Sequence, residues 1–144
     1  MIVRTLEDIT GTVRDTKAAN WQSRRFLLAD DRVGFSLHDT LIHPGTETLI
    51  WYKHHVEAVY CIDGTGEVEE TATGKIHRIE PGTLYVLNGH ERHLLRARST
   101  LRLICVFTPA LTGGEVHDDQ GVYPPSPAPE ANPPLAANAG PTSP

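Results

Sequence analysis

Residues 45–64 read GTETLIWYKHHVEAVYCIDG and decide the fold. Two segments rich in β-branched and aromatic residues, 47–53 and 58–62, are bounded by glycines and a polar turn, which is typical of short strands. If one strand runs unbroken as far as Glu57, its alternate side chains share a face: Leu49, Trp51, Lys53, His55 and Glu57. Tyr52 would then lie on the opposite face from Glu57. This stretch predicts β structure.

The same strand signal recurs on both sides of this stretch. The segments are residues 34–42, 66–71, 75–79, 83–87, 93–97 and 101–107. Many short strands separated by turns predict an all-β fold, either a sandwich or a barrel. In the last segment the alternate side chains Leu103, Cys105 and Phe107 share a face. Helical signal is weak, and we expect only a short helical turn near residues 15–22, where Asp15 could cap it.

The composition divides the 144 residues into two parts. The chain is 39% hydrophobic and 22% charged, which suits about one domain. Eight of the eleven prolines fall in residues 124–144, which hold one charged side chain, Glu130, and one large apolar side chain, Leu135. Such a segment has almost nothing to bury. We therefore expect a single domain over residues 1–123 and a disordered tail over 124–144.

Charge and hydropathy exclude several classes of protein. A net charge of −5 gives no basic surface for a phosphate backbone, which argues against nucleic-acid binding. No apolar run approaches the roughly 20 residues that span a bilayer, and the first residues lack the order of a signal peptide. Cys61 and Cys105 lie in apolar segments, which favours reduced thiols over a disulfide. We expect a cytoplasmic protein without membrane contact.

The glycine and glutamate spacing of residues 45–64 resembles the first cupin motif: glycine, five residues, His-x-His, three residues, glutamate, six residues, glycine. Trp51 and Lys53 replace the two histidines, whereas Glu57 is kept. The resemblance is to a cupin with an altered metal site. It implies a single jelly-roll-like cupin β-barrel with only minor helical turns.

A second cupin motif follows at residues 82–97, where Gly82 and the metal histidine, His93, are kept. In cupins these positions project into the barrel, so Glu57 and His93 could converge. Two ligands are too few for a transition-metal site, because such sites generally use three protein ligands. Tyr85 could supply a third as a hard phenolate oxygen. A strand tyrosine is more often a packed aromatic, so the residues alone leave this assignment open.

Beyond these motifs, most of the chain resembles the ectoine synthase family. The matching segments are MIVR at 1–4, WQSRR at 21–25, EAVYCIDG at 57–64, PGTLY at 81–85, LTGGEVHD at 111–118 and GVYP at 121–124. The resemblance implies a cytoplasmic, homodimeric, iron (Fe²⁺) dependent hydro-lyase. Its small-molecule substrate is N-γ-acetyl-L-2,4-diaminobutyrate, which it cyclises with loss of water to the compatible solute ectoine. It also implies the metal ligands Glu57, Tyr85 and His93.

The resemblance further implies a catalytic and a substrate-binding set of residues. The catalytic set is Tyr52, Glu115 and His117, and the substrate-binding set is Trp21, Arg25, Thr40, Cys105 and Phe107. The same resemblance implies that residues 111–123 form a lid, for which Gly113-Gly114 supplies backbone freedom.

Residue chemistry gives reasons for parts of these sets and leaves alternatives. Glu115 and His117 would face one way in an extended chain, although alone they would be assigned to an exposed acidic loop. Arg25 could bind the substrate's α-carboxylate in a bidentate manner beside Trp21. Without the family, Arg24-Arg25 would be a solvated basic pair. The six histidines other than His93 and His117 have no predicted chemistry.

Two other functions remain open at this level. The loss of both histidines from the first motif would suit a non-catalytic cupin that binds a metabolite, although the sequence has no effector segment for a sensor. Another iron-dependent cupin enzyme, such as a dioxygenase or isomerase, would also fit the fold. A dioxygenase would consume oxygen, whereas the cyclisation uses no oxidant.

Overall fold

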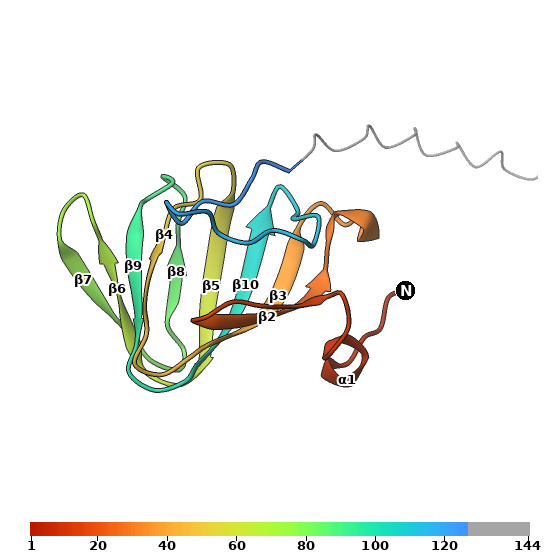
Figure 1. The fold of residues 1–144 in the computed structure, drawn as a ribbon, viewed down its shortest axis with the longest axis horizontal. Helices are drawn as coiled ribbons and strands as arrows, with labels where there is room; N and C mark the ends of the chain where they lie inside the picture. Colours follow the sequence, from red (N-terminus) through yellow and green to blue (C-terminus); the bar gives the residue numbers. More distant parts are fainter. Residues whose placement is uncertain (127–144) are drawn as a thin grey trace, which may run out of the picture.

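The computed structural model describes residues 1–126 (Figure 1). It contains one short α-helix, α1 (Leu6–Ile9), one 3₁₀ turn, η1 (Ala29–Asp31), and ten strands. The strands are β1 (Asp15–Lys17), β2 (Trp21–Leu27), β3 (Ser36–Ile42), β4 (Glu47–Ile50), β5 (Val56–Asp63), β6 (Gly66–Glu70), β7 (Lys75–Ile79), β8 (Leu84–Val86), β9 (His93–Ala97) and β10 (Leu101–Thr108). The all-β prediction is confirmed.

The strands form two antiparallel sheets that enclose one core. The larger sheet has the order β1-β2-β3-β10-β5-β8, and the smaller one β4-β9-β6-β7. No ladder joins the sheets within residues 1–126, so the barrel is open between them. The apolar core is a single cluster that draws on both sheets, for example Val59 and Leu103 from one and Val68 and Leu95 from the other. None of the helices in these residues is long and apolar enough to cross a membrane.

The helical turn predicted near residues 15–22 is wrong. This stretch instead forms β1 and the start of β2, which pair with Asp15 opposite Arg24. The Gln22 amide donates to the Asp15 carboxylate at 2.8 Å, and β2 is paired with β3 along its length. Cross-strand pairing therefore overrides the weak local preference. The one helix lies earlier in the chain, where Thr5 and Asp8 form a capping box.

The unbroken strand predicted through residues 47–57 is interrupted. Strand β4 ends at Ile50, and the chain turns before β5 begins. The Nδ1 atom of His90 lies 2.8 Å from the Tyr52 carbonyl and 3.1 Å from that of His55, which holds the turn in place. Both Tyr52 and Glu57 are buried. The turn thus exchanges the inner and outer faces and brings Tyr52 and Glu57 into the same interior.

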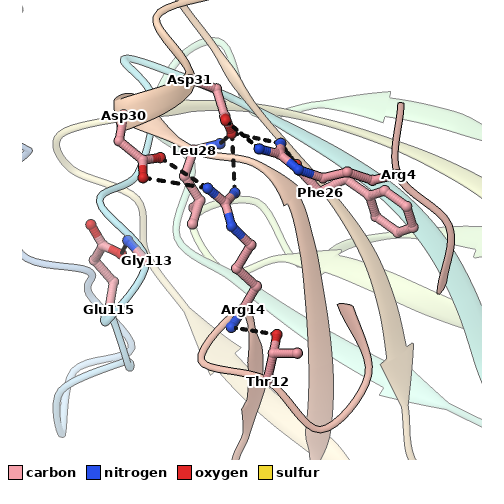
Figure 2. A network of polar contacts seen from close by, with 9 residues as sticks. All are labelled: Arg4, Thr12, Arg14, Phe26, Leu28, Asp30, Asp31, Gly113 and Glu115. Atoms are coloured by element: carbon pink, nitrogen blue, oxygen red, sulfur yellow. Dashed lines mark hydrogen bonds and ion pairs between the residues drawn. The ribbon is translucent and has the colours of Figure 1, made fainter. Parts of the chain in front are cut away.

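A polar network fixes the N-terminal segment against the end of β2 (Figure 2). The Asp31 carboxylate accepts hydrogen bonds from Arg4 at 2.6 and 3.0 Å, from Arg14 at 3.0 Å and from the Leu28 backbone amide at 2.9 Å. These donors hold the pKa of Asp31 down at about 2. Leu28 packs beside Gly113, so the network also supports the start of the C-terminal segment.

Replacing Asp31 with asparagine is expected to lower the free energy of unfolding by about 1–2 kcal/mol at pH 7. Because the carboxyl pKa is depressed in the folded state, this contribution is present above the ordinary pKa of 3.8 and is lost as the pH falls towards 2. Urea denaturation at pH 7 and near pH 2 measures both values. Asp30→Asn, with a side chain that is 72% exposed, is the matched control and should change little. An equal loss in both variants would contradict the prediction.

Candidate active site

A small cavity lies inside the fold, between the two sheets and the C-terminal segment. Its volume is about 30 Å³, which is room for roughly two water molecules. Eight of the eleven predicted site residues line it: Trp21, Thr40, Tyr52, Glu57, Tyr85, Cys105, Phe107 and His117. Arg25, His93 and Glu115 do not line this cavity. The strand spacing thus brings together residues that are far apart in sequence.

Strand alternation explains why the larger sheet presents these side chains inward. On β10, Leu103, Cys105 and Phe107 are all buried, as predicted, and the residues between them are more exposed. Phe107 lies opposite Glu57 of β5 in the antiparallel register. Glu57 and Val59 therefore share the inner face of β5.

The predicted metal ligands carry the features of an incomplete cation site. Burial raises the pKa of Glu57 to about 8 and that of Tyr85 well above its ordinary value. The His93 ring is buried, and its Nδ1 lies 3.0 Å from the Glu91 carbonyl, to which it donates. Its Nε2 then carries a lone pair and has no partner. A carboxylate, a phenolate and an imidazole are hard or intermediate donors, which suit ferrous iron.

Tyr85 is the one residue of the predicted ligand set that lines two neighbouring hollows. This side chain lines both the central cavity and an adjoining cleft of about 640 Å³, and His93 lines the cleft. The rings of Tyr52 and His93 have centroids 6.2 Å apart, so the two sides are close. Within residues 1–126 no three His, Cys, Asp or Glu side chains come together as a metal site. The predicted ligand set contains only two such residues, Glu57 and His93, because its third member is the phenol of Tyr85.

Tyr52, which is buried, and His117, which is half-buried, form a pair that lines the cavity. The Tyr52 hydroxyl lies 3.0 Å from His117 Nε2, and His117 Nδ1 has no partner. Burial, together with the neighbouring His93 and Arg25, lowers the pKa of His117 to about 4, so the ring is neutral at pH 7. The ring stacks on Tyr123 with centroids 4.3 Å apart and an interplanar angle of 11°. The pair can exchange a proton with a ligand in the cavity.

Arg25 and Glu115 do not line the cavity and instead contact each other. The Arg25 side chain is fully buried and donates to the carbonyl oxygens of Gly113 and Glu115, each at 2.7 Å. Its Nη1 lies 3.5 Å from the Glu115 carboxylate, which also accepts hydrogen bonds from Thr112 and Gly113. These contacts fasten the C-terminal segment to β2. The predicted contact of Arg25 with substrate stays a prediction.

The rest of the C-terminal segment runs across one end of the strands (Figure 1). The Trp51 amide donates to the Gly121 carbonyl at 2.7 Å. Gly121 has φ +78°, and a Cβ there would lie 2.2 Å from the Leu49 carbonyl oxygen, so this close approach needs glycine. His55 Nε2 lies 2.9 Å from the Ser126 hydroxyl. The predicted tail falls mainly on residues 127–144, which lie outside the described residues.

Eight other residues line the cavity and were not predicted as site residues, and three of them, Ser23, His38 and Tyr123, carry polar groups close to the predicted ones. Ser23 and His38 lie in polar strands whose inward face gives no apolar signal. Tyr123 stands in the GVYP segment that supports the family resemblance. The sequence around it is typical of an exposed loop, so only the fold shows that this side chain is buried. Its ring also contacts those of Tyr52 and Phe107.

Comparison with known proteins agrees with this geometry. The ectoine synthase family matches residues 1–127. An L-ectoine synthase of Oceanobacillus iheyensis is 56% identical over 124 residues, covering 86% of this chain and 97% of that one. The crystal structure of ectoine synthase from P. lautus superposes with a TM-score of 0.76 at 59% identity, covering 78% of this chain and 81% of that chain.

More distant structures show the fold alone. The Cupin_2 domain of a transcriptional regulator from Enterobacter cloacae superposes with a TM-score of 0.53 at 16% identity, covering 62% of this chain and 96% of that chain. The two facing sheets are therefore a cupin fold, as predicted. The high identity to L-ectoine synthases over most of the chain goes further, and the chain belongs to the ectoine synthase family.

Proposed function

We propose that this protein is an L-ectoine synthase, a hydro-lyase that closes N-γ-acetyl-L-2,4-diaminobutyrate into ectoine. The observation that carries the proposal is that one cavity gathers a buried carboxylate, Glu57, and a neutral Tyr52–His117 pair in a chain of this family. The α-amine adds to the acetyl carbonyl, and the adduct then loses water. The reaction needs a neutral amine, a polarised carbonyl and a proton for the departing oxygen.

Glu57, Tyr85 and His93 would hold ferrous iron in this proposal. The buried, partnerless Nε2 of His93 and the uncompensated carboxyl of Glu57 support the assignment. When bound, the ion would supply Lewis acidity to the acetyl oxygen. Burial raises the pKa of Tyr85 and Glu57 only while no cation balances them, because a nearby positive charge favours both anionic forms.

Proton transfer falls to Tyr52 and His117. His117 is neutral at pH 7 and can accept a proton from the α-ammonium or from the nitrogen of the adduct. Burial keeps the Tyr52 phenol protonated, so it can donate a hydrogen bond to the oxygen that leaves as water. Their separation of 3.0 Å allows a proton to pass between them. Glu115 acts by holding the segment that carries His117.

Water must be kept out, because released water competes in a solvent of about 55 M. Trp21, Phe107 and Tyr123 give the cavity aromatic walls. A cavity of about 30 Å³ is smaller than the substrate. Residues 111–123 would therefore open to admit it and close again over it, with Gly113-Gly114 as the flexible point.

The same proposal includes a homodimer in the cytoplasm. Both cysteines in the chain, Cys61 and Cys105, are free and buried, which supports a reducing compartment. An edge strand with exposed apolar side chains, such as Leu84 and Val86 of β8, supports pairing with another chain.

The direct experiment supplies purified protein with ferrous iron and the acetylated diamino acid under anaerobic conditions and measures ectoine. Formation of ectoine is expected. Saturable binding without product would instead indicate a metabolite-binding cupin, and oxygen consumption on substrate addition under air would indicate a dioxygenase.

Replacing Tyr85 with phenylalanine is expected to lower bound iron and to slow ectoine formation at least tenfold, because one anionic ligand is lost. Iron content by atomic absorption and the turnover rate are measured on the same sample. Tyr60→Phe is the control, since Tyr60 is 46% exposed on the outer face of β5. Normal iron content in Tyr85→Phe would rule out Tyr85 as a ligand.

A further inference from the structure

His38 is a buried histidine on β3 with one ring nitrogen unaccounted for. The residue is 1% exposed and lines the central cavity, and its Nε2 has no hydrogen-bond partner. A buried polar atom without a partner costs stability, so its retention needs a reason. The proposed proton transfer and iron binding do not use this atom.

Neighbouring groups favour one tautomer of His38. Its Nδ1 lies 3.0 Å from the Ser23 hydroxyl, and Arg25 Nε donates to the same hydroxyl over a long 3.4 Å. Arg25 can only donate, so the serine accepts from it and its own hydrogen is available to His38 Nδ1. When the hydroxyl donates to Nδ1, the neutral ring carries its hydrogen on Nε2, on the side of the cavity. The chain of donors runs from Arg25 through Ser23 to an N–H group on the cavity.

The His38 ring is held neutral, so in this tautomer its one N–H group, at Nε2, is the donor. Burial and the positive charge of Arg25 keep the pKa of His38 well below 6.5. Arg25 itself does not line the cavity, and its terminal nitrogens donate to two backbone carbonyls of the C-terminal segment. Its charge still favours an anion on the far side of Ser23 and His38.

The register of the sheet places His38 opposite the proposed metal end of the cavity. His38 pairs with Cys105, Cys105 with Val59, and Val59 with Tyr85. The backbones of His38 and Tyr85 are three strand spacings apart, which is about 14 Å. The distance between the ends of the two side chains is shorter than this. A bound substrate whose acetyl group meets Glu57 and Tyr85 would direct its other end towards β2 and β3. An anionic group is also repelled from the carboxylate of Glu57.

We propose that His38 Nε2–H donates a hydrogen bond to the α-carboxylate of the substrate, and that Ser23 is the positioning residue that fixes the donating tautomer. This inference rests on the proposed function, because the carboxylate belongs to that substrate. It assigns to the Ser23–His38 pair the recognition that the sequence alone assigned to Arg25.

The test compares KM and kcat for His38→Leu, His38→Gln and wild type. Losing a hydrogen bond to a charged group is expected to raise KM about 10–100-fold in His38→Leu, with kcat changing less than about threefold. His38→Gln places an amide N–H near the former Nε2 and should recover most of the affinity. His54→Leu, at an exposed position in the turn before β5, is the control and should match wild type.

A substrate analogue separates recognition from a purely structural role. The α-carboxamide analogue lacks the anionic group, so the KM ratio between His38→Leu and wild type should fall below about threefold with it. Equal KM ratios for carboxylate and carboxamide, or an unchanged KM in His38→Leu, would overturn the inference. If wild type itself forms no ectoine, the proposed function fails instead. Should His38→Leu not fold, the same two ligands are compared in Ser23→Ala, where the preference for carboxylate should fall severalfold.

Discussion

Replacing Glu57 with glutamine is expected to reduce ectoine formation at least 100-fold and, at the same time, to make the iron-free protein more stable at pH 8. The carboxylate is the more acidic of the two anionic ligands in the proposed set, so its loss should release iron. Without iron the same carboxylate is a buried charge with no cation to balance it. Function and stability thus make opposite demands at this position.

The pH dependence of this effect has a definite sign. The pKa of Glu57 is about 8 in the folded, iron-free chain and 4.5 when unfolded. Between these values the folded state retains a proton that the unfolded state has released, so the free energy of unfolding falls as the pH rises. The total loss is roughly 5 kcal/mol. Glutamine does not titrate, so the free energy of unfolding of Glu57→Gln should not show this decline with pH.

Denaturant unfolding in the presence of a chelator at pH 5, 6.5 and 8 measures the difference between the two proteins. Histidines with lowered pKa values, including the buried His38 and the half-buried His117, act in the opposite sense below pH 6.5, because the unfolded chain binds protons that the folded chain does not. They are common to both proteins and cancel in the difference. A difference that does not grow with pH would contradict the expected burial of the Glu57 charge.

Replacing Arg25 with methionine is expected to cost about 3–5 kcal/mol of stability and to abolish activity, because it leaves Glu115 as a buried charge without its cation. It also removes both hydrogen bonds to the carbonyl oxygens of residues 113 and 115. The segment that carries His117 should therefore detach from β2.

Limited proteolysis followed by mass spectrometry tests this effect directly. Faster cleavage within residues 111–123 is expected in Arg25→Met than in wild type, together with a lower unfolding midpoint. Arg78→Met removes an exposed arginine, with a side chain that is 77% exposed, and should behave as wild type. Arg25→Lys should be intermediate, because one ammonium cannot bridge both carbonyls as a guanidinium does. Unaltered cleavage in Arg25→Met would mean that other contacts hold the segment.

The parts of the fold that were predicted are those where apolar and polar residues alternate. Strands β7 and β9 begin and end as predicted, and β10 extends one residue further. Strand β2 was missed because Ser23 and Arg25 follow Trp21 on its inner face, so the face is mostly polar. Such a strand is recognisable only once β3 pairs with it and the C-terminal segment binds Arg25.

The candidate site, like the fold, was predicted only in part. Motif spacing and family resemblance named eight residues that the strands bring to one cavity. Arg25 and Glu115 were named with roles towards the substrate, whereas the structure joins them to each other across 90 positions of sequence. No local pattern reports an ion pair at that separation. His38 was not predicted as a site residue, because no motif in the sequence distinguishes it from the other histidines.

The turn between β4 and β5 has a consequence for how a metal site can be built on this scaffold. Trp51 and Lys53 occupy the two histidine positions of the usual cupin motif, yet Lys53 is exposed and its ammonium lies 4.0 Å above the Trp51 ring. Neither residue lines the central cavity. The donors of the proposed metal set lie instead on strands β5, β8 and β9, so on this scaffold the strands after the turn, rather than the turn itself, would supply the ligands.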